Sequence, residues 1–210
     1  YSMSFDGNDD YININNPFST DLDQVSISFW LKTDTYLGYN ECLVAKWTDQ
    51  NQGTARPFVI YAENNLINFF VNGGCRAVTL DQNELNFNQW NLLTFIYDNL
   101  NNVIQVYHNG ILKSSNTISC QPMYLSFNND LNIGNLPPNS NYYNGELDDV
   151  QIWSKVLSLQ EMQDYMNCPP TGNEQGLLGY WNFDEGSGST VYDQTSNGNN
   201  GTINGATYDS

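Results

Sequence analysis

Apolar and polar residues alternate with a period of two along many short stretches of the chain. The run VSISFWLK at residues 25–32 is the clearest example. Side chains of an extended strand point to opposite faces in turn, so this pattern predicts half-buried β-strands. Similar runs rich in β-branched and aromatic residues lie at 2–5, 11–14, 42–47, 58–62, 66–71, 76–80, 90–97, 103–108, 111–113, 131–134, 145–153 and 177–183.

Asparagine and glycine separate these runs. Asn64-Asn65, the NGG sequence at 72–74 and Asn109-Gly110 have the chemistry of tight hairpin turns, so consecutive strands are expected to pair antiparallel. One helix is expected after Ser158, because Ser158 and Glu161 form a capping box. Its expected apolar face holds Leu159, Met162, Tyr165 and Met166, and the Cys-Pro-Pro sequence at 168–170 ends it. Many evenly spaced strands with one short helix predict an all-β fold, an antiparallel β-sandwich or jelly roll.

Composition limits the partners. The chain has 210 residues and a net charge of −17, from 23 Asp and Glu against 6 Lys and Arg. Nucleic acids and anionic membrane surfaces are bound by clusters of basic residues, so neither is an expected partner. No apolar run reaches the roughly 20 residues that cross a bilayer. Excess carboxylate suits calcium, a hard cation that prefers oxygen ligands, although acidic surfaces also simply keep proteins soluble.

The four cysteines are Cys42, Cys75, Cys120 and Cys168. None form a CxxC pair and His108 is the single histidine, which argues against zinc. An even count in a Lys-poor chain fits disulfides in an oxidising compartment, with three possible connectivities. We therefore expect an extracellular or cell-surface protein. No signal-peptide pattern is present, so this would be a mature or excised piece.

Several segments resemble laminin-G-like (concanavalin A-like) jelly-roll domains of bacterial surface proteins. They are SFDGNDDY at 4–11, ISFWLK at 27–32, LDDVQIW at 147–153 with LS at 157–158, and GYWNFDEGSG at 179–188 with Asp193 and 197–201. Their order departs from the family, in which the segment with YWNF normally precedes the one with SFDG. A register cut from tandem repeats or a circular permutation would explain this order.

The chain is accordingly expected to form a single domain over residues 1–210. Residues 1–168 would form the main body, 169–176 a linker, and 177–210 a segment that completes the same sandwich, because jelly-roll termini usually lie close together. The alternative is that residues 177–210 begin a further repeat and swap onto another molecule.

Calcium is the expected cofactor. Jelly rolls of this kind hold calcium with acidic residues and loop carbonyls near the meeting of the chain ends. That resemblance implies ligands at Asp6, Asn8, Asp148, Asp193 and Asn199. The alternative is that these side chains cap turns through hydrogen bonds to the backbone.

The segment 145–153 also resembles the Glu-x-Asp-x-x-Glu strand of laminarinase-type glycosidases. Glu146, Asp148 and Gln151 occupy that frame. Retaining hydrolysis needs two carboxyl groups, and Gln151 cannot exchange the required proton. We therefore expect no catalytic residue and no enzyme.

Sugar sites combine an aromatic surface with polar side chains. The candidate ligand-binding residues are Trp47, Arg56, Arg76, Tyr142 and Tyr143, with Tyr36 and Tyr39 also in loops. Trp30, Trp90, Trp153 and Trp181 lie in strand patterns and are assigned to the core. One possible disulfide pairing joins Cys120 to Cys168 and Cys42 to Cys75.

The sequence thus predicts a calcium-stabilised, non-catalytic adhesion or carbohydrate-binding module, a monomeric part of a larger secreted or surface protein. Its partner would be a glycan or a cell-surface protein. One alternative is a spacer repeat of an adhesin that has no ligand of its own. The other is a laminarinase-like glycoside hydrolase.

Overall fold

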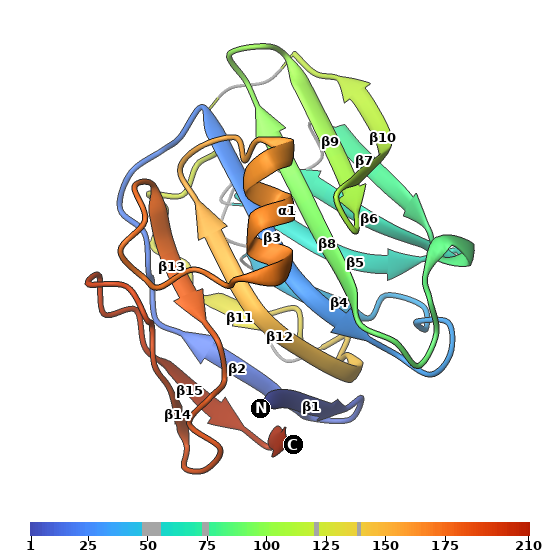
Figure 1. Ribbon diagram of the computed structural model, residues 1–210, viewed down its shortest axis with the longest axis vertical. Coiled ribbons are helices and arrows are strands. Elements are labelled where there is room, and N and C mark those ends of the chain that lie inside the picture. Colours follow the sequence, from blue (N-terminus) through green and yellow to red (C-terminus); the bar gives the residue numbers. More distant parts are fainter. Residues whose placement is uncertain (48–55, 73–75, 120–121, 138–139) are drawn as a thin grey trace.

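A computed structural model describes residues 1–47, 56–72, 76–119, 122–137 and 140–210, which form two facing antiparallel sheets (Figure 1). Sheet A has the order β10-β9-β8-β3-β12-β1-β16, and β13 also pairs with β12. Its strands are β1 (Ser2–Asp6), β3 (Gln24–Lys32), β8 (Asn91–Asp98), β9 (Val103–His108), β10 (Ile111–Thr117), β12 (Asn144–Trp153), β13 (Leu177–Trp181) and β16 (Thr207–Asp209).

Sheet B has the order β14-β15-β2-β11-β4-β5-β6-β7. Its strands are β2 (Tyr11–Ile14), β4 (Cys42–Lys46), β5 (Phe58–Glu63), β6 (Leu66–Val71), β7 (Arg76–Asp81), β11 (Leu131–Ile133), β14 (Thr190–Val191) and β15 (Gly201–Asn204). A short 3-10 helix, η2 (Gln82–Glu84), follows β7. The predicted fold class, an antiparallel sandwich, is confirmed.

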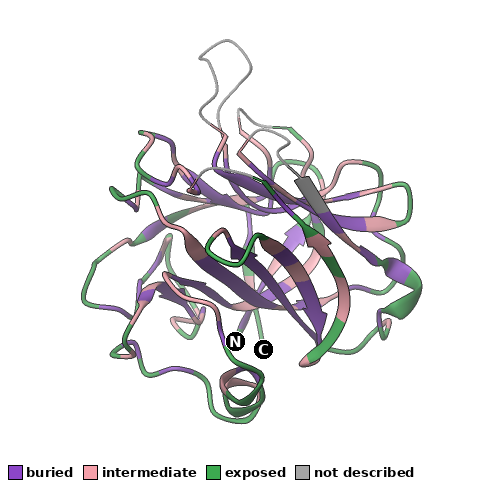
Figure 2. Ribbon diagram, turned by 90° about the horizontal axis from the view of Figure 1, so that it is seen from above, coloured by how far each residue is buried: buried purple, intermediate pink, exposed green. Residues whose placement is uncertain are grey.

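The core lies between the two sheets, and Figure 2 shows that the buried residues concentrate in the strands of the sandwich. Alternation along β3 places Val25, Ile27, Phe29 and Leu31 inward. The two layers meet through aromatic rings, because Phe69 of sheet B lies 5.4 Å from Phe95 of sheet A. Burial of these period-two apolar faces is what drives the layers together.

Helix α1 (Leu159–Asn167) lies over the outer face of sheet A (Figure 1). The predicted capping box is present, since Ser158 accepts from the Glu161 amide and Glu161 accepts from the Ser158 amide. Met162 is buried and Tyr165 stacks on Trp153 at 5.1 Å, whereas Leu159 is 52% exposed. Leu159, which the sequence placed on the apolar face of the helix, therefore does not pack against the sheet. Across the described residues, no helix is long and apolar enough to cross a membrane.

The two ends of the chain meet beside β12. Strands β1 and β13 pair one after the other with the same strand, β1 opposite residues 144–147 and β13 opposite residues 150–153. Strand β16 extends sheet A beside β1, and β15 extends sheet B beside β2, so residues 177–210 contribute to both layers (Figure 1). Gly172 packs so closely on this segment that an added Cβ would lie 2.0 Å from the Gln194 carbonyl oxygen.

Two expectations about buried residues need correction. Trp153 and Trp181 are fully buried as predicted, but Trp90 is 36% exposed, and Trp30 is half-buried on the outer face of β3. Cys42 and Cys168 carry free thiols, so neither predicted disulfide forms; Cys75 and Cys120 lie outside the described residues. The Cys42 thiol is instead buried and donates to the Ile60 carbonyl oxygen at 3.6 Å.

Candidate functional site

Three aromatic residues and one arginine lie together on the outer face of sheet B. We call this group the outer aromatic cluster and define it as Trp47, Arg56, Tyr61 and Phe70. Trp47, Tyr61 and Phe70 pack on the buried side chains of Cys42, Ala45 and Val59, which form a cluster separate from the core residues of β4 and β5. The Tyr61 and Phe70 rings stack 5.6 Å apart on neighbouring strands, and all three aromatic side chains remain half-buried.

Arg56 stacks on this cluster. Its guanidinium carbon lies 5.0 Å from the centre of the Trp47 ring, so the structure joins two of the predicted ligand-binding residues. Such a contact is favourable because the face of the indole ring attracts a cation. The Arg56 Nε is buried and has no hydrogen-bond partner among the described residues. A buried donor without a partner is costly, so the stacking on Trp47 is what holds this side chain in place.

A second unpaired donor borders the same cluster. The Asn135 Nδ2 is buried and finds no partner in the part of the chain that the structure describes, while the Asn135 Oδ1 accepts from Asn132 at 2.6 Å. Asn132 lies opposite Ala45 in the sheet, and Leu136 packs on Cys42, Ala45 and Val59. No period-two pattern reveals this donor, because residue 135 lies in the loop that follows β11.

The remaining predicted ligand-binding residues lie elsewhere. Tyr143 is fully buried and its hydroxyl donates to the Lys32 carbonyl oxygen at 3.0 Å, so its assignment as a ligand-binding residue is wrong. Tyr142 is half-buried with its ring 6.4 Å from that of Tyr11. Tyr36 donates to Asn83 at 2.7 Å and Tyr39 is 71% exposed. The side chain of Arg76 lies outside the described part of the chain.

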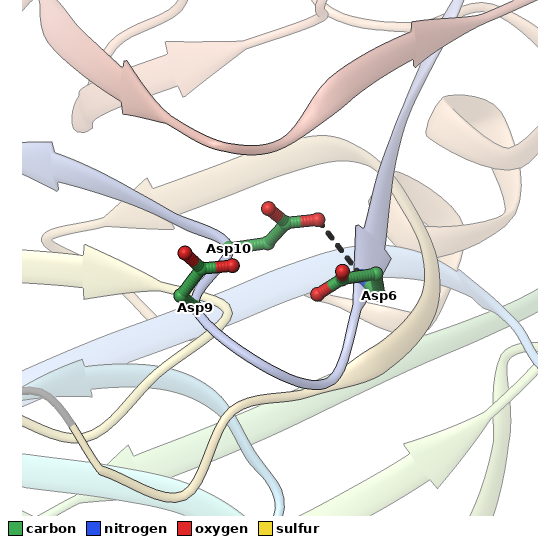
Figure 3. A group of neighbouring side chains, drawn as sticks. All are labelled: Asp6, Asp9 and Asp10. Carbon is green, nitrogen blue, oxygen red and sulfur yellow. Dashed lines mark hydrogen bonds between the residues drawn. The ribbon is translucent and has the colours of Figure 1, made fainter.

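The turn between β1 and β2 gathers three carboxylates. Asp6, Asp9 and Asp10 each place an oxygen within 4.8 Å of the others (Figure 3). Asp10 accepts from the Asp6 amide at 2.8 Å, and Asp6 accepts from the Asn8 amide at 2.8 Å. Burial, followed by the charges of Asp6 and Asp9, raises the pKa of Asp10, whereas hydrogen bonds from Asn8 lower the pKa of Asp6. Carboxylates this close repel one another, and a cation would relieve that repulsion.

Asp193 organises the loop before β15. Its carboxylate accepts from the backbone amides of Tyr180, Thr195 and Asn199 at 3.1, 2.9 and 2.9 Å, and the residue is only 8% exposed. The Asn199 side chain donates to the Leu178 carbonyl oxygen at 3.1 Å. The side chains of Asp193 and Asn199 therefore form hydrogen bonds with backbone groups of the turn. This is the alternative to calcium binding that the sequence left open for these two residues.

Asp148 lies at a third place. Asp6 pairs with Asn144 along β12, and Asp148 is four residues further on, about 13 Å away at ~3.3 Å per residue. A register shift follows Asp148, and Asp149 adopts φ +48° and accepts from the Tyr180 hydroxyl. Burial, followed by the charge of Asp149, raises the pKa of Asp148 to about 7. The expected calcium ligands thus do not gather into one cage.

The side chains on β12 that match the glycosidase motif form hydrogen bonds within the protein. Glu146 accepts from the Lys32 ammonium group at 2.7 Å and from the Ser2 hydroxyl at 3.0 Å. Gln151 is 2% exposed and accepts from the Trp153 indole at 3.2 Å. Two free carboxyl groups facing a sugar, which retaining hydrolysis needs, are not available in this frame.

A cavity of about 300 Å³ lies between the loop before β3 and the loop before β15. No sequence pattern indicates this cavity, because Phe18, Leu178 and Asn197 are far apart along the chain. Only the pairing of β13 and β15 with distant strands brings these residues together.

The sandwich and its helix define a concanavalin A-like jelly roll. A laminin G family model, described as the Concanavalin A-like lectin/glucanases superfamily, matches residues 6–163, and the chain belongs to this family. The resemblance seen in the sequence is thereby confirmed. The family description covers lectins and glucanases, so membership fits both binding and hydrolysis. No curated protein matches the sequence.

Similar solved structures share the fold at low sequence identity. A Bacteroides ovatus protein described as a candidate carbohydrate binding protein is 17% identical with a TM-score of 0.72, over 99% of this chain and 60% of its own. A heptameric SAP-like pentraxin from Limulus polyphemus is 15% identical with a TM-score of 0.62, over 82% and 85%. Domain 4 of AbnA, an extracellular arabinanase from Geobacillus stearothermophilus in complex with arabinotriose, is 19% identical with a TM-score of 0.51, over 72% and 69%.

Proposed function

We propose that this chain is a non-catalytic carbohydrate-binding module of a larger extracellular protein, and that the outer aromatic cluster contacts the glycan. The observation that carries the proposal is the half-buried aromatic surface of Trp47, Tyr61 and Phe70, with the Arg56 guanidinium carbon 5.0 Å from the centre of the Trp47 ring. Support also comes from the similar Bacteroides ovatus protein and from the AbnA domain with its arabinotriose. The chain spans about 60% of the length of the Bacteroides ovatus protein, which fits a module within a longer chain.

The chemistry of the cluster suits a sugar. The apolar C–H faces of a pyranose or furanose ring pack on aromatic surfaces, and the cluster offers Trp47, Tyr61 and Phe70 half-buried side by side. The half-buried Arg56 side chain adds a planar guanidinium group at its border. Sugar hydroxyls or ring oxygens would accept hydrogen bonds from the guanidinium group, which only donates.

The contacts of the polar side chains on β12 favour glycan binding over hydrolysis. Glu146 is held in an ion pair with Lys32, and Gln151 replaces the second carboxyl that the glycosidase frame needs. Helix α1 also covers the outer face of sheet A next to Gln151 and Trp153. A glycan could therefore not reach Gln151 without displacing the helix.

We also propose that calcium stabilises the domain at the turn between β1 and β2. Three carboxylates within 4.8 Å, with Asn8 beside them, match the oxygen-rich donor set of calcium sites. A calcium ion there would fix the turn that joins sheet A to sheet B at the meeting of the chain ends. The spread of Asp148 and Asp193 to other places limits the proposed site to this turn.

A glycan array tests the binding function, using the labelled chain with calcium and with EDTA. For a glycan that binds, affinity measured by calorimetry is expected to fall at least about tenfold in Trp47→Ala, because buried tryptophans carry much of the energy of such sites. Arg56→Lys keeps the charge but removes the planar Nε donor and should also weaken binding. Trp90→Ala removes an exposed tryptophan elsewhere and serves as the control.

Two outcomes would count against the proposal. Glycan binding that Trp47→Ala and Arg56→Lys leave unchanged would remove the outer aromatic cluster as its site. No glycan bound under either condition would favour a spacer repeat without its own ligand.

A further inference from the structure

The cavity of about 300 Å³ has an apolar floor and an uncharged polar mouth. Phe18 is buried at 7% exposure and lies at the base with half-buried Leu22 and Leu178. Ser19, Thr20 and Asn197 are exposed and line the opening. None of the residues of the outer aromatic cluster contribute to it. Its volume is at the lower end of the range of ligand pockets, which suits one or two sugar rings.

Its walls are held rigidly on both sides. Asp193 fixes the loop before β15 through three backbone amides, and the Trp181 indole donates to the Asn199 carbonyl oxygen at 2.8 Å. On the other side, the Leu22 and Met123 backbones exchange two hydrogen bonds, at 3.1 and 2.7 Å. A cavity with fixed walls loses little conformational entropy when a ligand enters.

The polar groups at the mouth are positioned and available. The Nδ2 atoms of Asn197 and Asn199 both donate to the Leu178 carbonyl oxygen, at 3.0 and 3.1 Å. A carbonyl oxygen only accepts, so each amide must turn its Oδ1 away from Leu178. Within the described residues, neither Oδ1 and neither hydroxyl of Ser19 and Thr20 takes part in an internal hydrogen bond. The mouth thus offers two fixed acceptors and two hydroxyls that both donate and accept.

Charge selects the class of ligand. The residues that line the cavity are uncharged, and the whole chain carries −17. An acidic sugar would lose its hydration without gaining a cation, and the field of the protein would repel it. A neutral sugar would place C–H groups on Phe18, Leu22 and Leu178 and its hydroxyls on the mouth. We propose that this cavity binds a terminal neutral sugar residue, as a second glycan site of the module; this rests on the proposed carbohydrate-binding function.

The test is a titration of the isotope-labelled chain with neutral mono- and disaccharides, followed through backbone amide signals. Signals from residues 17–22 and 197–199 are expected to shift in a saturable way. Thr20→Val keeps the volume and removes one hydroxyl, so the dissociation constant should rise about threefold to tenfold. Ser19→Trp, which fills the mouth, should abolish the shifts. Thr202→Val, the same substitution at an exposed threonine on β15, should leave them unchanged.

The possible failures can be told apart. Shifts at Trp47 and Arg56 but none at the cavity would overturn this inference and leave the proposed function standing. The same holds if Thr20→Val and Ser19→Trp both bind as the native chain does, or if only uronate-bearing sugars shift the cavity signals. If no glycan shifts any signal, both the proposed carbohydrate-binding function and the proposed cavity site are wrong.

Discussion

Replacing Asp148 by asparagine tests the electrostatics of the junction where β1 and β13 meet on β12. The carboxyl of Asp148 is half-buried next to Asp149, and its pKa is raised from an ordinary 3.8 to about 7. Asparagine has nearly the same shape and keeps the oxygen that accepts from the Asp149 amide at 2.8 Å. The substitution therefore removes the charge and little else.

The sign and size of the effect follow from the raised pKa. Between about pH 4 and about pH 7 the folded state keeps a proton on Asp148 that the unfolded chain has released, so stability falls as pH rises through this window. A shift of about 3 units corresponds to about 4 kcal/mol at ~1.4 kcal/mol per unit. Solvent reaches part of this half-buried side chain, which reduces the expected effect to about 2 kcal/mol.

Thermal unfolding in EDTA at a series of pH values, monitored by circular dichroism, measures this difference in stability. At about pH 8 the Asp148→Asn chain should melt about 4–8 °C above the native chain, since 1 kcal/mol corresponds to about 2–4 °C for this size. At about pH 4 the two chains should melt together, because the native carboxyl is then protonated when folded. Asp34→Asn, at an exposed position, should follow the native chain at every pH. A difference between the Asp148→Asn and native chains that did not change with pH would refute the reasoning.

Two further predictions concern calcium and the core. EDTA should lower the melting temperature of the native chain, and calcium at a hundredfold excess over its dissociation constant should restore about 2.7 kcal/mol of unfolding free energy. Asp9→Asn should lose this response to calcium, whereas Asp34→Asn should keep it. A native melting temperature that EDTA leaves unchanged would exclude the site. Phe69→Ala should cost about 3–5 kcal/mol in urea unfolding, because Phe69 is fully buried against Phe95 between the sheets. Phe70→Ala, on the half-buried outer face of the same strand, should cost clearly less, and equal costs would contradict the assignment of faces.

Local patterns predicted much of the fold, because alternation and capping are properties of neighbouring residues. The runs at 25–32 and 66–71 became β3 and β6, and Ser158 with Glu161 began α1. Pairing between distant strands could not be predicted in this way. The motif resemblance suggested that Asp6, Asp148 and Asp193 would share a corner, yet the register of β1 on β12 separates Asp6 from Asp148 by four residues. Tyr143 was misassigned for a related reason, since its burial depends on contacts with Phe5 and Lys32 from other strands.

The placement of the two proposed glycan sites follows from how β12 is used. This strand pairs with β3 on one side and with both β1 and β13 on the other, so its polar residues hold the chain ends together. Helix α1 covers the outer face of sheet A around Trp153, and the Lys32–Glu146 ion pair spans β3 and β12 beyond it. In sheet B the corresponding outer face carries no helix among the described residues, and its aromatic side chains stay half-buried. The polar residues of the strand that resembles a glycosidase are therefore held in structural contacts, and we place the two proposed glycan sites on the outer aromatic cluster and in the cavity beside β13.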